Sequence, residues 1–343
     1  MLGEIAEEPA VIERLLRESA GPLEAVRRAI VRHDPRLVVI VARGSSFYAG
    51  LYGRYLVETV VGRPVVMAAP AVTSVYGRPV PYPGALVVAI SQGGRSPDLL
   101  AVTEAARRDA ALTVVLTNDS VSPLAGLGDL TVPLQAGSEA VSATKSYVAE
   151  LAALAAIVAA WAGRDDLLAA LGRAPGALAR VLESSERWLD AEPDVIAAAA
   201  ASERILVVSR GYDLATALET ALKLKEAAAL FADGFSASDF LHGHVVLATP
   251  EVPLVAIRPE GRAAASVDAA LEGAAAYGSR PWLIGGSSVA SRPRALALQH
   301  GLPEEVAPLV HIVPGQMLAE RVARARGRDP DHPAGLTKLI LTM

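Results

Sequence analysis

The sequence predicts an α/β protein with two similar, doubly wound parallel sheets of the flavodoxin type, each with helices on both faces. Short, continuously apolar runs alternate with helical patterns along the chain, which is typical of βαβ units. A strand that runs into [AS]RG and then into a helix occurs once in each half, at Ala42-Arg43-Gly44 and at Ser209-Arg210-Gly211. These two observations indicate an internal duplication.

The first half contains three apolar runs that are bounded by turn residues and suit strands buried on both faces of a sheet. They are residues 37–42 (LVVIVA), 85–90 (ALVVAI) and 112–117 (LTVVLT). Helical patterns follow at 46–61 and 97–111. The segment before Pro35 is predicted to form two helices that pack on this domain or on a partner.

The second half repeats the order, with strands predicted at 205–209, 252–257 and 282–284 and a helix at 213–230. The linking region, 142–201, is rich in Ala and Leu, so we expect helices there and not a flexible tether. The predicted divisions are N-terminal helices (1–34), a first domain (35–165), a helical connection (166–200), a second domain (201–330) and a C-terminal tail that closes the active site (331–343).

Composition narrows the function classes. The chain has 343 residues, 52% of them hydrophobic, which favours two domains with large cores. The net charge is −5, and the Arg-rich stretch 321–328 falls in an amphipathic helix pattern, so a nucleic-acid surface is not expected. The absence of cysteine excludes a disulfide framework, a thiolate metal site and a cysteine nucleophile.

Targeting signals are not expected either. Residues 1–15 are acidic, whereas a secretory signal begins with basic residues before an apolar centre. The longest apolar run, 151–162, is shorter than the ~20 residues that cross a bilayer, so it predicts a buried helix. We therefore expect a cytoplasmic protein without a membrane partner.

Two Ser/Gly-rich loops follow successive predicted strands and open helices. The first contains Gly44, Ser45 and Ser46, and the second is SQGGRS at 91–96. Glycine lets a ligand approach the backbone, and the helix N-terminus and serine hydroxyls supply donors for phosphate oxygens. Such residues also cap helices, but two loops at neighbouring strand ends favour a phosphate site. Neither loop matches a nucleotide-binding motif. A third Ser/Thr cluster, 138–146, precedes the long apolar helix.

The helical stretch 217–230 (ALETALKLKEAAAL) carries a candidate acid–base group. Glu219, Lys223 and Glu226 lie at spacings of four and three and share one face, whereas Lys225 is displaced from it. On a surface this set would be an ion-pair ladder. The apolar flanks indicate a buried helix instead, where a carboxylate beside a lysine can be tuned for proton transfer.

Three further side chains are candidates. His242, which precedes a glycine, would be presented by a tight turn, and His244 completes an HxH pair for which the sequence offers no third metal ligand. Lys338 stands in an apolar C-terminal tail. Its amine would either reach solvent or act on a carbonyl.

Together these residues resemble the double sugar-isomerase (SIS) domain family. The chain is similar to the isomerase half of glucosamine-6-phosphate synthase, and closer to the stand-alone glucosamine-6-phosphate deaminases built on that fold. The resemblance covers about residues 35–343. It rests on RGSSFYAG (43–50), SQGGRSPD (91–98), ATKS (143–146), ALKLKE (221–226), His242-Gly243 and DPDHPAGLTK (329–338).

The resemblance implies roles for these positions. Glu226 would move a proton between C1 and C2, with support from Lys223. His242 would assist ring opening from the neighbouring subunit of a homodimer, and Lys338 would act at the sugar carbonyl, without metal or cofactor. The phosphate would be held by Ser46, Ser91, Gln92, Gly93 and Ser96, and the sugar bordered by Ser142 and Ala143.

The chain departs from the family pattern in places. Gly93 stands where the family usually has Ser, His244 replaces the usual Pro, and the loop 139–145 is one residue shorter, beside Ser142. The glutaminase half, which uses an N-terminal cysteine, is absent, so ammonia release from glutamine by that route is not expected.

The sequence therefore predicts an isomerising deaminase that converts glucosamine 6-phosphate to fructose 6-phosphate and ammonia. Two alternatives stay open. One is another enzyme of the same chemistry, either an aldose–ketose isomerase without nitrogen chemistry or a deglycase of an amine-linked hexose phosphate. The other is a non-catalytic sugar-phosphate-binding regulator. The sequence does not determine the epimer bound, the reaction direction or any allosteric effector.

Overall fold

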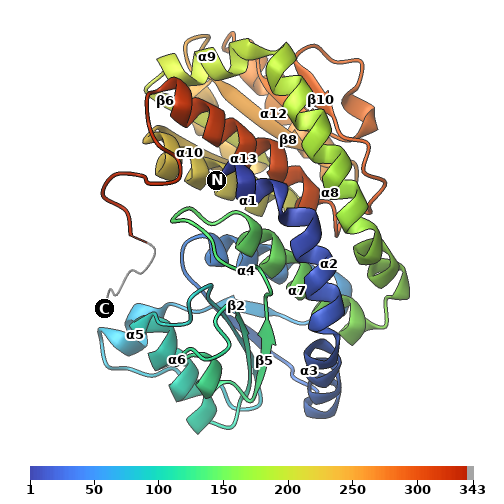
Figure 1. Cartoon of the computed structure of the whole chain (residues 1–343), viewed down its shortest axis with the longest axis vertical. Coiled ribbons are helices and arrows are strands. Elements are labelled where there is room, and N and C mark those ends of the chain that lie inside the picture. Colours follow the sequence, from blue (N-terminus) through green and yellow to red (C-terminus); the bar gives the residue numbers. More distant parts are fainter. Residues whose placement is uncertain (338–343) are drawn as a thin grey trace. The chain divides into compact units, whose positions relative to one another are not determined.

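The computed structural model describes residues 1–337 of the chain and divides them into two compact units. The first unit consists chiefly of Ala10–Glu139 and Lys145–Gly172. The second unit contains Met1–Pro9, Ala140–Thr144 and Arg173–Leu336. Each unit contains one five-stranded sheet (Figure 1).

The two sheets have the same topology. In the first unit the strand order is β2-β1-β3-β4-β5, and in the second it is β7-β6-β8-β9-β10, with every pairing parallel. Counted along the chain, both orders are 2-1-3-4-5, the flavodoxin-type arrangement. This confirms the predicted doubly wound fold and the internal duplication. The strands are β1 Val38–Val41, β2 Val65–Met67, β3 Leu86–Ile90, β4 Leu112–Thr117, β5 Leu130–Pro133, β6 Arg204–Ser209, β7 Phe231–Ser236, β8 Leu254–Arg258, β9 Trp282–Gly285 and β10 Ala295–Ala297.

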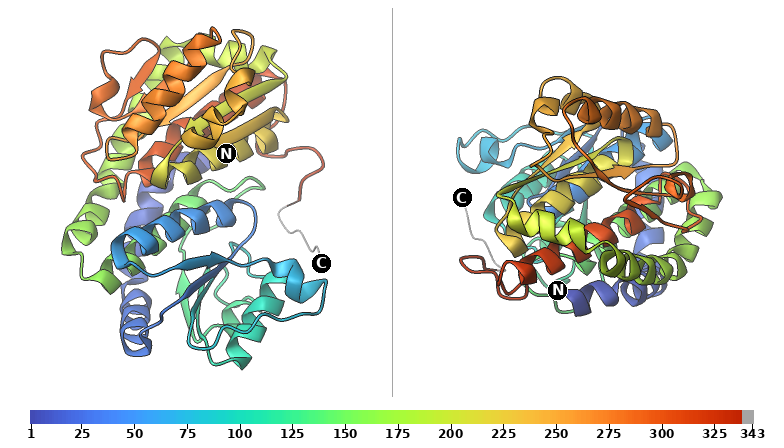
Figure 2. Two further views of the ribbon diagram at one scale, coloured as in Figure 1. Left: turned by 180° about the vertical axis from the view of Figure 1, so that it is seen from behind. Right: turned by 90° about the horizontal axis from the view of Figure 1, so that it is seen from above.

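Helices flank both faces of each sheet (Figure 2). In the second unit, α10 and α13 pack side by side (Figure 1). The helices are α1 Leu2–Ala6, α2 Glu8–Glu18, α3 Ala20–His33, α4 Ser45–Leu56, α5 Pro70–Ser74, α6 Pro97–Arg108, α7 Lys145–Ala162, α8 Asp165–Ala191, α9 Pro193–Ala201, α10 Leu214–Ala228, α11 Ala237–Leu241, α12 Ala264–Ala276 and α13 Pro308–Ala325.

The alternation of side chains along the central strands explains why these runs are apolar throughout. Val39 and Val41 belong to the core cluster that packs on α6, while Val38 and Ile40 face α3, α4 and α7 on the other side. A strand covered on both faces needs apolar residues at every position.

The predicted number of N-terminal helices was wrong. Three helices, α1, α2 and α3, precede the first strand where two were predicted. Pro9 stands at the second position of α2, and proline in the first turn of a helix costs no hydrogen bond, so it favours the start of a new helix there. The N-terminal segment is also divided between the two units, because Met1–Pro9 belongs to the second unit.

The predicted buried helix is confirmed as α7. Of the described helices, α7 alone is long and apolar enough by composition to cross a membrane, and 83% of that span is buried inside the protein. Its residues Lys145 to Ala159 are buried on every face. A helix that is apolar all round is expected in the core of a large fold.

A chain of buried polar groups joins α10 to α13 in the second unit. Asp213, just before α10, accepts a hydrogen bond from Thr216 and lies 2.8 Å from His311 Nδ1. His311 Nε2 lies 3.2 Å from Nε2 of His300, whose Nδ1 accepts the N–H of Leu302. That last bond places the proton of neutral His300 on Nε2, so it donates to His311, and His311 donates to Asp213.

Burial, and next the electrostatic interaction with the neighbouring His311, lower the pKa of His300 to about 4, from 6.5. Glu260 and Asp213 act in the opposite direction, and Arg180 adds to the lowering. Because the folded-state pKa lies below the unfolded value, the unfolded chain binds more protons between pH 6.5 and 4. The contribution of His300 to the free energy of unfolding is therefore fully present above pH 6.5 and is lost as the pH falls towards 4.

We expect His300→Gln to remove that part of the acid sensitivity, on the order of 3 kcal/mol between pH 6.5 and 4. Urea unfolding at several pH values gives the free energy of unfolding, and the slope of this free energy against pH is compared between wild type and variant. His332→Gln, at an exposed histidine, is the control and should keep the wild-type slope. Parallel pH profiles for wild type and His300→Gln would contradict the assignment.

Candidate active site

The first Ser/Gly-rich loop joins β1 to α4. Gly44 has a φ of 56°, a left-handed value that glycine adopts without strain, and α4 begins at the next residue. The Ser46 hydroxyl donates a 2.7 Å hydrogen bond to Oε1 of Glu150 on α7, and both side chains are buried, with 8% and 1% exposed. A hydroxyl has one proton, so Ser46 would offer a phosphate its backbone N–H at the helix start.

The second loop joins β3 to α6 and is held by its own serine. The Ser91 hydroxyl accepts the N–H of Gly94 at 3.1 Å, and Gly94 has a φ of 59°. A Cβ at Gly94 would lie 2.2 Å from the Ser122 hydroxyl, so a side chain would not fit. Gln92, Gly93 and Ser96 are partly exposed around this turn, as a phosphate loop requires.

Asp98 braces the two loops from the first turn of α6. Its carboxylate is 2% exposed and accepts hydrogen bonds from Arg43, which precedes Gly44, and from Ser74. Arg95 pairs at 2.8 Å with Asp119, after β4. Loops at the carboxyl ends of β1, β3 and β4 are thus tied together within the first unit, where ligands bind in open α/β sheets.

The predicted acid–base set is on α10 in the second unit, and its geometry confirms the shared face. The Lys223 ammonium lies 2.5 Å from Oε2 of Glu226 and 3.3 Å from Oε1 of Glu219. Glu219 and Lys223 are 0% exposed, and Glu226 is 25% exposed. The set is therefore not a surface ion-pair ladder, because only its last carboxylate reaches solvent.

Lys223 remains a cation in this setting. Burial alone would lower the pKa of its ammonium, but the charges of Glu219 and Glu226 and the hydrogen bonds to them more than offset burial and raise the pKa above the usual value. The ammonium holds Glu226 by a charge-assisted hydrogen bond and forms an ion pair with Glu219. Glu226 is thus held at one end, while its exposed side is available to a substrate.

Glu226 lines a cavity of about 370 Å³ at the C-terminal end of α10. The opposite wall comes from the segment after α13, which carries the DPDHPAGLTK motif, and includes Asp329, His332 and Leu336. Cationic side chains of Lys225 and Arg328 also line the cavity. The structure therefore brings two of the motifs quoted from the sequence to one cavity within the second unit.

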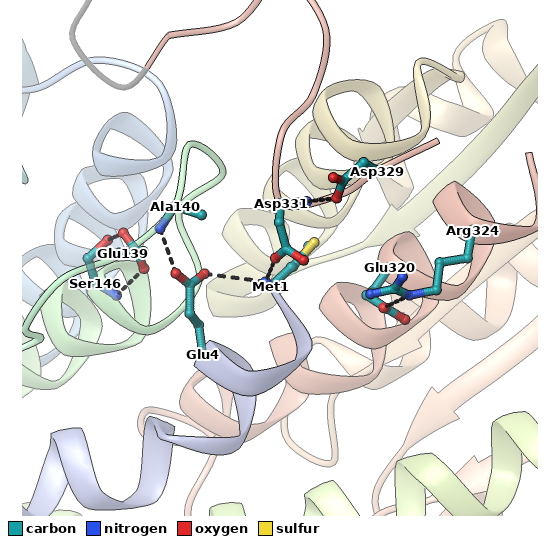
Figure 3. Close-up of polar contacts among 9 residues, drawn as sticks. All are labelled: Met1, Glu4, Glu139, Ala140, Ser146, Glu320, Arg324, Asp329 and Asp331. Atoms are coloured by element: carbon teal, nitrogen blue, oxygen red, sulfur yellow. Dashed lines mark hydrogen bonds and ion pairs between the residues drawn. The ribbon is translucent and has the colours of Figure 1, made fainter. Parts of the chain in front are cut away.

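Helix α1 holds two segments of the second unit by polar contacts: the segment that begins at Ala140 and the segment 329–331 (Figure 3). The Glu4 carboxylate accepts the N–H of Ala140 at 2.5 Å and pairs with the amino group of Met1 at 3.7 Å. Met1 also donates to Asp331, whose own N–H donates at 2.9 Å to Asp329 (Figure 3). The segment beginning at Ala140 and the segment 329–331 are held to the same short helix.

The other predicted residues are placed as follows. Ser142 is 2% exposed in the segment Ala140–Thr144, and its hydroxyl is buried without a hydrogen-bond partner among the described residues; Ala143 follows it. His242 ends α11, is exposed, and does not line the cavity of Glu226. Gly243 has a φ of 141°, so the predicted tight turn is present. Lys338 lies outside the described residues.

Sequence reasoning missed the partners that hold the site. Glu150 is the only acidic residue of α7, and a lone carboxylate in an apolar helix signals a buried polar contact. Asp98 was quoted only as the end of a motif, and nothing in the sequence pointed to Glu4. Within residues 1–337, no three His, Asp or Glu side chains gather as metal ligands.

A larger cavity lies elsewhere in the second unit. It has a volume of about 610 Å³, lies where β8 and β9 begin, and is lined by residues including Glu251, Arg280 and Trp282. Ligands of open α/β sheets bind at the carboxyl ends of the strands, so we do not assign the active site to this cavity.

Fold and loops define an α/β protein with two duplicated, doubly wound sheets, in which Ser/Gly-rich loops open the helices at one sheet and a buried carboxylate–lysine set lies beside the other. A family model described as the SIS domain matches residues 33–160 and 200–309. The chain belongs to the SIS domain family and contains two such domains.

Curated relatives support the resemblance to the isomerising aminotransferases. The chain is 32% identical to a glutamine–fructose-6-phosphate aminotransferase (isomerizing) of Zymomonas mobilis, over 99% of this chain and 58% of that protein. It thus spans a little over half the length of the curated relatives it matches.

Solved structures share the whole fold. A candidate phosphosugar isomerase from Silicibacter pomeroyi has 36% identity and a TM-score of 0.87, covering 96% of this chain and 99% of that one. The C-terminal domain of a Francisella tularensis glucosamine-fructose-6-phosphate aminotransferase has 26% identity and a TM-score of 0.85, covering 97% of each chain. A Thermotoga maritima glucosamine-6-phosphate deaminase, at 19% identity and a TM-score of 0.74 over 96% of this chain and 100% of that one, shares the fold.

Proposed function

We propose that the protein is a phosphosugar isomerase and, more narrowly, an isomerising deaminase that converts glucosamine 6-phosphate and water to fructose 6-phosphate and ammonia. One observation carries the proposal. Glu226 is a partly exposed carboxylate whose inner side is held by a fully buried lysine and whose outer side lines a cavity of about 370 Å³.

The proton transfer follows from the chemistry of an open-chain amino sugar. Glu226 removes the proton from C2, which the adjacent aldehyde makes acidic, and returns it to C1. Over the same steps the aldehyde oxygen gains a proton and becomes the C1 hydroxyl, and the nitrogen gives one up, so the double bond then lies between C2 and nitrogen. Water adds to this imine, and ammonia leaves. The carboxylate is regenerated, so no redox or metal step is needed to balance the reaction.

Binding is assigned to the loops of the first unit. The N–H groups at the starts of α4 and α6, with the Ser91 and Ser96 hydroxyls, would take the phosphate. Gly44, Ser45, Gln92 and Gly93 shape these loops, and Ser142 and Ala143 would border the sugar. Lys338 is proposed to act at the carbonyl.

The test is ammonia release from glucosamine 6-phosphate by the purified protein, coupled to a dehydrogenase that consumes ammonia. We expect turnover that depends on Glu226, with fructose 6-phosphate formed in equal amount. A panel of hexose phosphates and amine-linked hexose phosphates separates the alternatives. Turnover of these compounds only would replace the deaminase by an aldose–ketose isomerase or a deglycase, and tight binding without turnover would indicate a regulator.

We further propose a cytoplasmic homodimer in which His242 of one subunit assists ring opening in the other. The exposed position of His242 directly after α11, away from the cavity of Glu226, supports this assignment. Sedimentation analysis measures the assembly. Mixing a His242→Ala variant with a Glu226→Gln variant should restore part of the activity, and failure to do so in a proven dimer would contradict the shared site.

A further inference from the structure

The duplication allows the carboxyl edges of the two sheets to be compared position by position. β8 is the counterpart of β3, and α12 is the counterpart of α6. The loop before α6 ends in Gly94-Arg95-Ser96, and the loop before α12 ends in Gly261-Arg262-Ala263. The same Gly-Arg pair therefore stands at the same distance from both helices.

In the first unit this loop leaves its amides available. Among the described residues, no protein group accepts the N–H of Arg95 or of Ser96. Both groups precede the first turn of α6, where the helix dipole favours an anion. This is the loop to which the phosphate is assigned.

In the second unit the corresponding amides are already bound. Oε2 of Glu304 accepts the N–H of Arg262 at 3.0 Å, and Oε1 accepts the N–H of Ala263 at 3.4 Å. A Cβ at Gly261 would lie 1.6 Å from Oε2 of Glu304, so the carboxylate rests directly on the glycine. A carboxylate of the chain occupies the position of an anion at the start of α12.

Other substitutions in the second unit agree with this. Ser96 has Ala263 as its counterpart, which removes a hydroxyl. Gly93 corresponds to Glu260, whose carboxylate accepts the N–H of Ser288 at 3.2 Å after β9. Ser46 corresponds to Asp213, which is used by His311. Each change removes a phosphate donor or adds a negative charge that would repel phosphate.

We propose that the loop before α12 is a second copy of the anion-binding loop, filled permanently by the carboxylate of Glu304. Each chain therefore binds the phosphate of its substrate in the first unit only, and the second unit is closed to it. A tetrahedral oxyanion such as inorganic phosphate would enter the second loop only when Glu304 is removed. This holds whatever reaction the enzyme catalyses.

Two substitutions of Glu304 distinguish the effect of its charge from the effect of the space that its side chain fills. Glu304→Ala opens the loop, so the variant should bind one more inorganic phosphate per chain than wild type by calorimetric titration, and its thermal midpoint should rise with phosphate accordingly. Glu304→Gln keeps the space filled and should bind no additional phosphate. Glu272→Ala removes an exposed carboxylate from the far part of the same helix and should match wild type. Equal phosphate binding by Glu304→Ala and wild type would overturn the proposal.

Hydrogen exchange on the unaltered protein provides a test that needs no variant. Adding a hexose phosphate should slow exchange in the segment 91–97 and leave 259–264 unchanged. Protection of 259–264 by the sugar phosphate would contradict the proposal. If the sugar phosphate protected neither segment, this would contradict the assigned phosphate site but not the role of Glu304.

Discussion

Glu226→Gln is expected to lower kcat for ammonia release by roughly 10²–10⁴-fold, the usual contribution of a positioned general base. Glutamine keeps the size of the side chain but cannot take a proton from C2. Because Glu226 is partly exposed and its amide could still accept a hydrogen bond from Lys223, the fold should survive. Steady-state kinetics, with thermal unfolding measured alongside, gives the result.

The matched control is Glu272→Gln, an exposed glutamate on α12, which should keep kcat and KM. A binding measurement with the substrate completes the test, since Glu226→Gln should still bind it. If Glu226→Gln turned over within about tenfold of wild type, the assignment of the base would fail.

Lys223→Met is expected to cost about 3–5 kcal/mol of unfolding free energy, because it leaves the buried Glu219 and its neighbour Glu226 without their shared cation. The side chain of Met fits the space of the lysine stem, so the loss is electrostatic and not a cavity effect. Urea unfolding measures the change. Activity should fall with it, since Glu226 loses the group that orients it.

Lys225→Met is the control for stability, as Lys225 is two residues away on the same helix and exposed. It should change the unfolding free energy little. A double variant, Glu219→Gln with Lys223→Met, removes one uncompensated charge and should recover part of the stability. If Lys223→Met were as stable as Lys225→Met, the buried ammonium would have no structural role.

Six of the ten described strands could be predicted because their signal is local, whereas the short strands β2, β5 and β10 and the glycine-containing β7 were not predicted. Continuous apolar runs such as 112–117, bounded by turn residues, identify doubly covered strands, and β4 has those bounds. The loops at 44–46 and 91–96 follow directly from strand ends, so their place in the fold was also predictable. The three N-terminal helices were less so, because α1 is five residues long and carries too little periodic pattern to be recognised.

The candidate base could be identified from spacing on one helix, but its environment could not. The pattern ALKLKE shows that Glu219, Lys223 and Glu226 share a face, and the same pattern is equally consistent with an exposed ladder. Burial decides between the two, and much of it comes from α13, which packs on α10 although it is distant in sequence; the neighbouring strands β6 and β7 add to it. The contacts of Glu4 with Ala140 and of Ser46 with Glu150 are also long-range.

The sequence by itself determined the duplicated α/β architecture, the two Ser/Gly-rich loops at strand ends and the helix that carries Glu226, because periodicity, glycine and strand-to-helix junctions act over neighbouring residues. Only the tertiary structure decided which carboxylates are buried, that Lys223 is shared between two of them, and that Glu304 fills the second loop. These depend on free energies of desolvation and on hydrogen bonds between residues far apart in the chain, such as Glu304 and Arg262, and no local pattern records them.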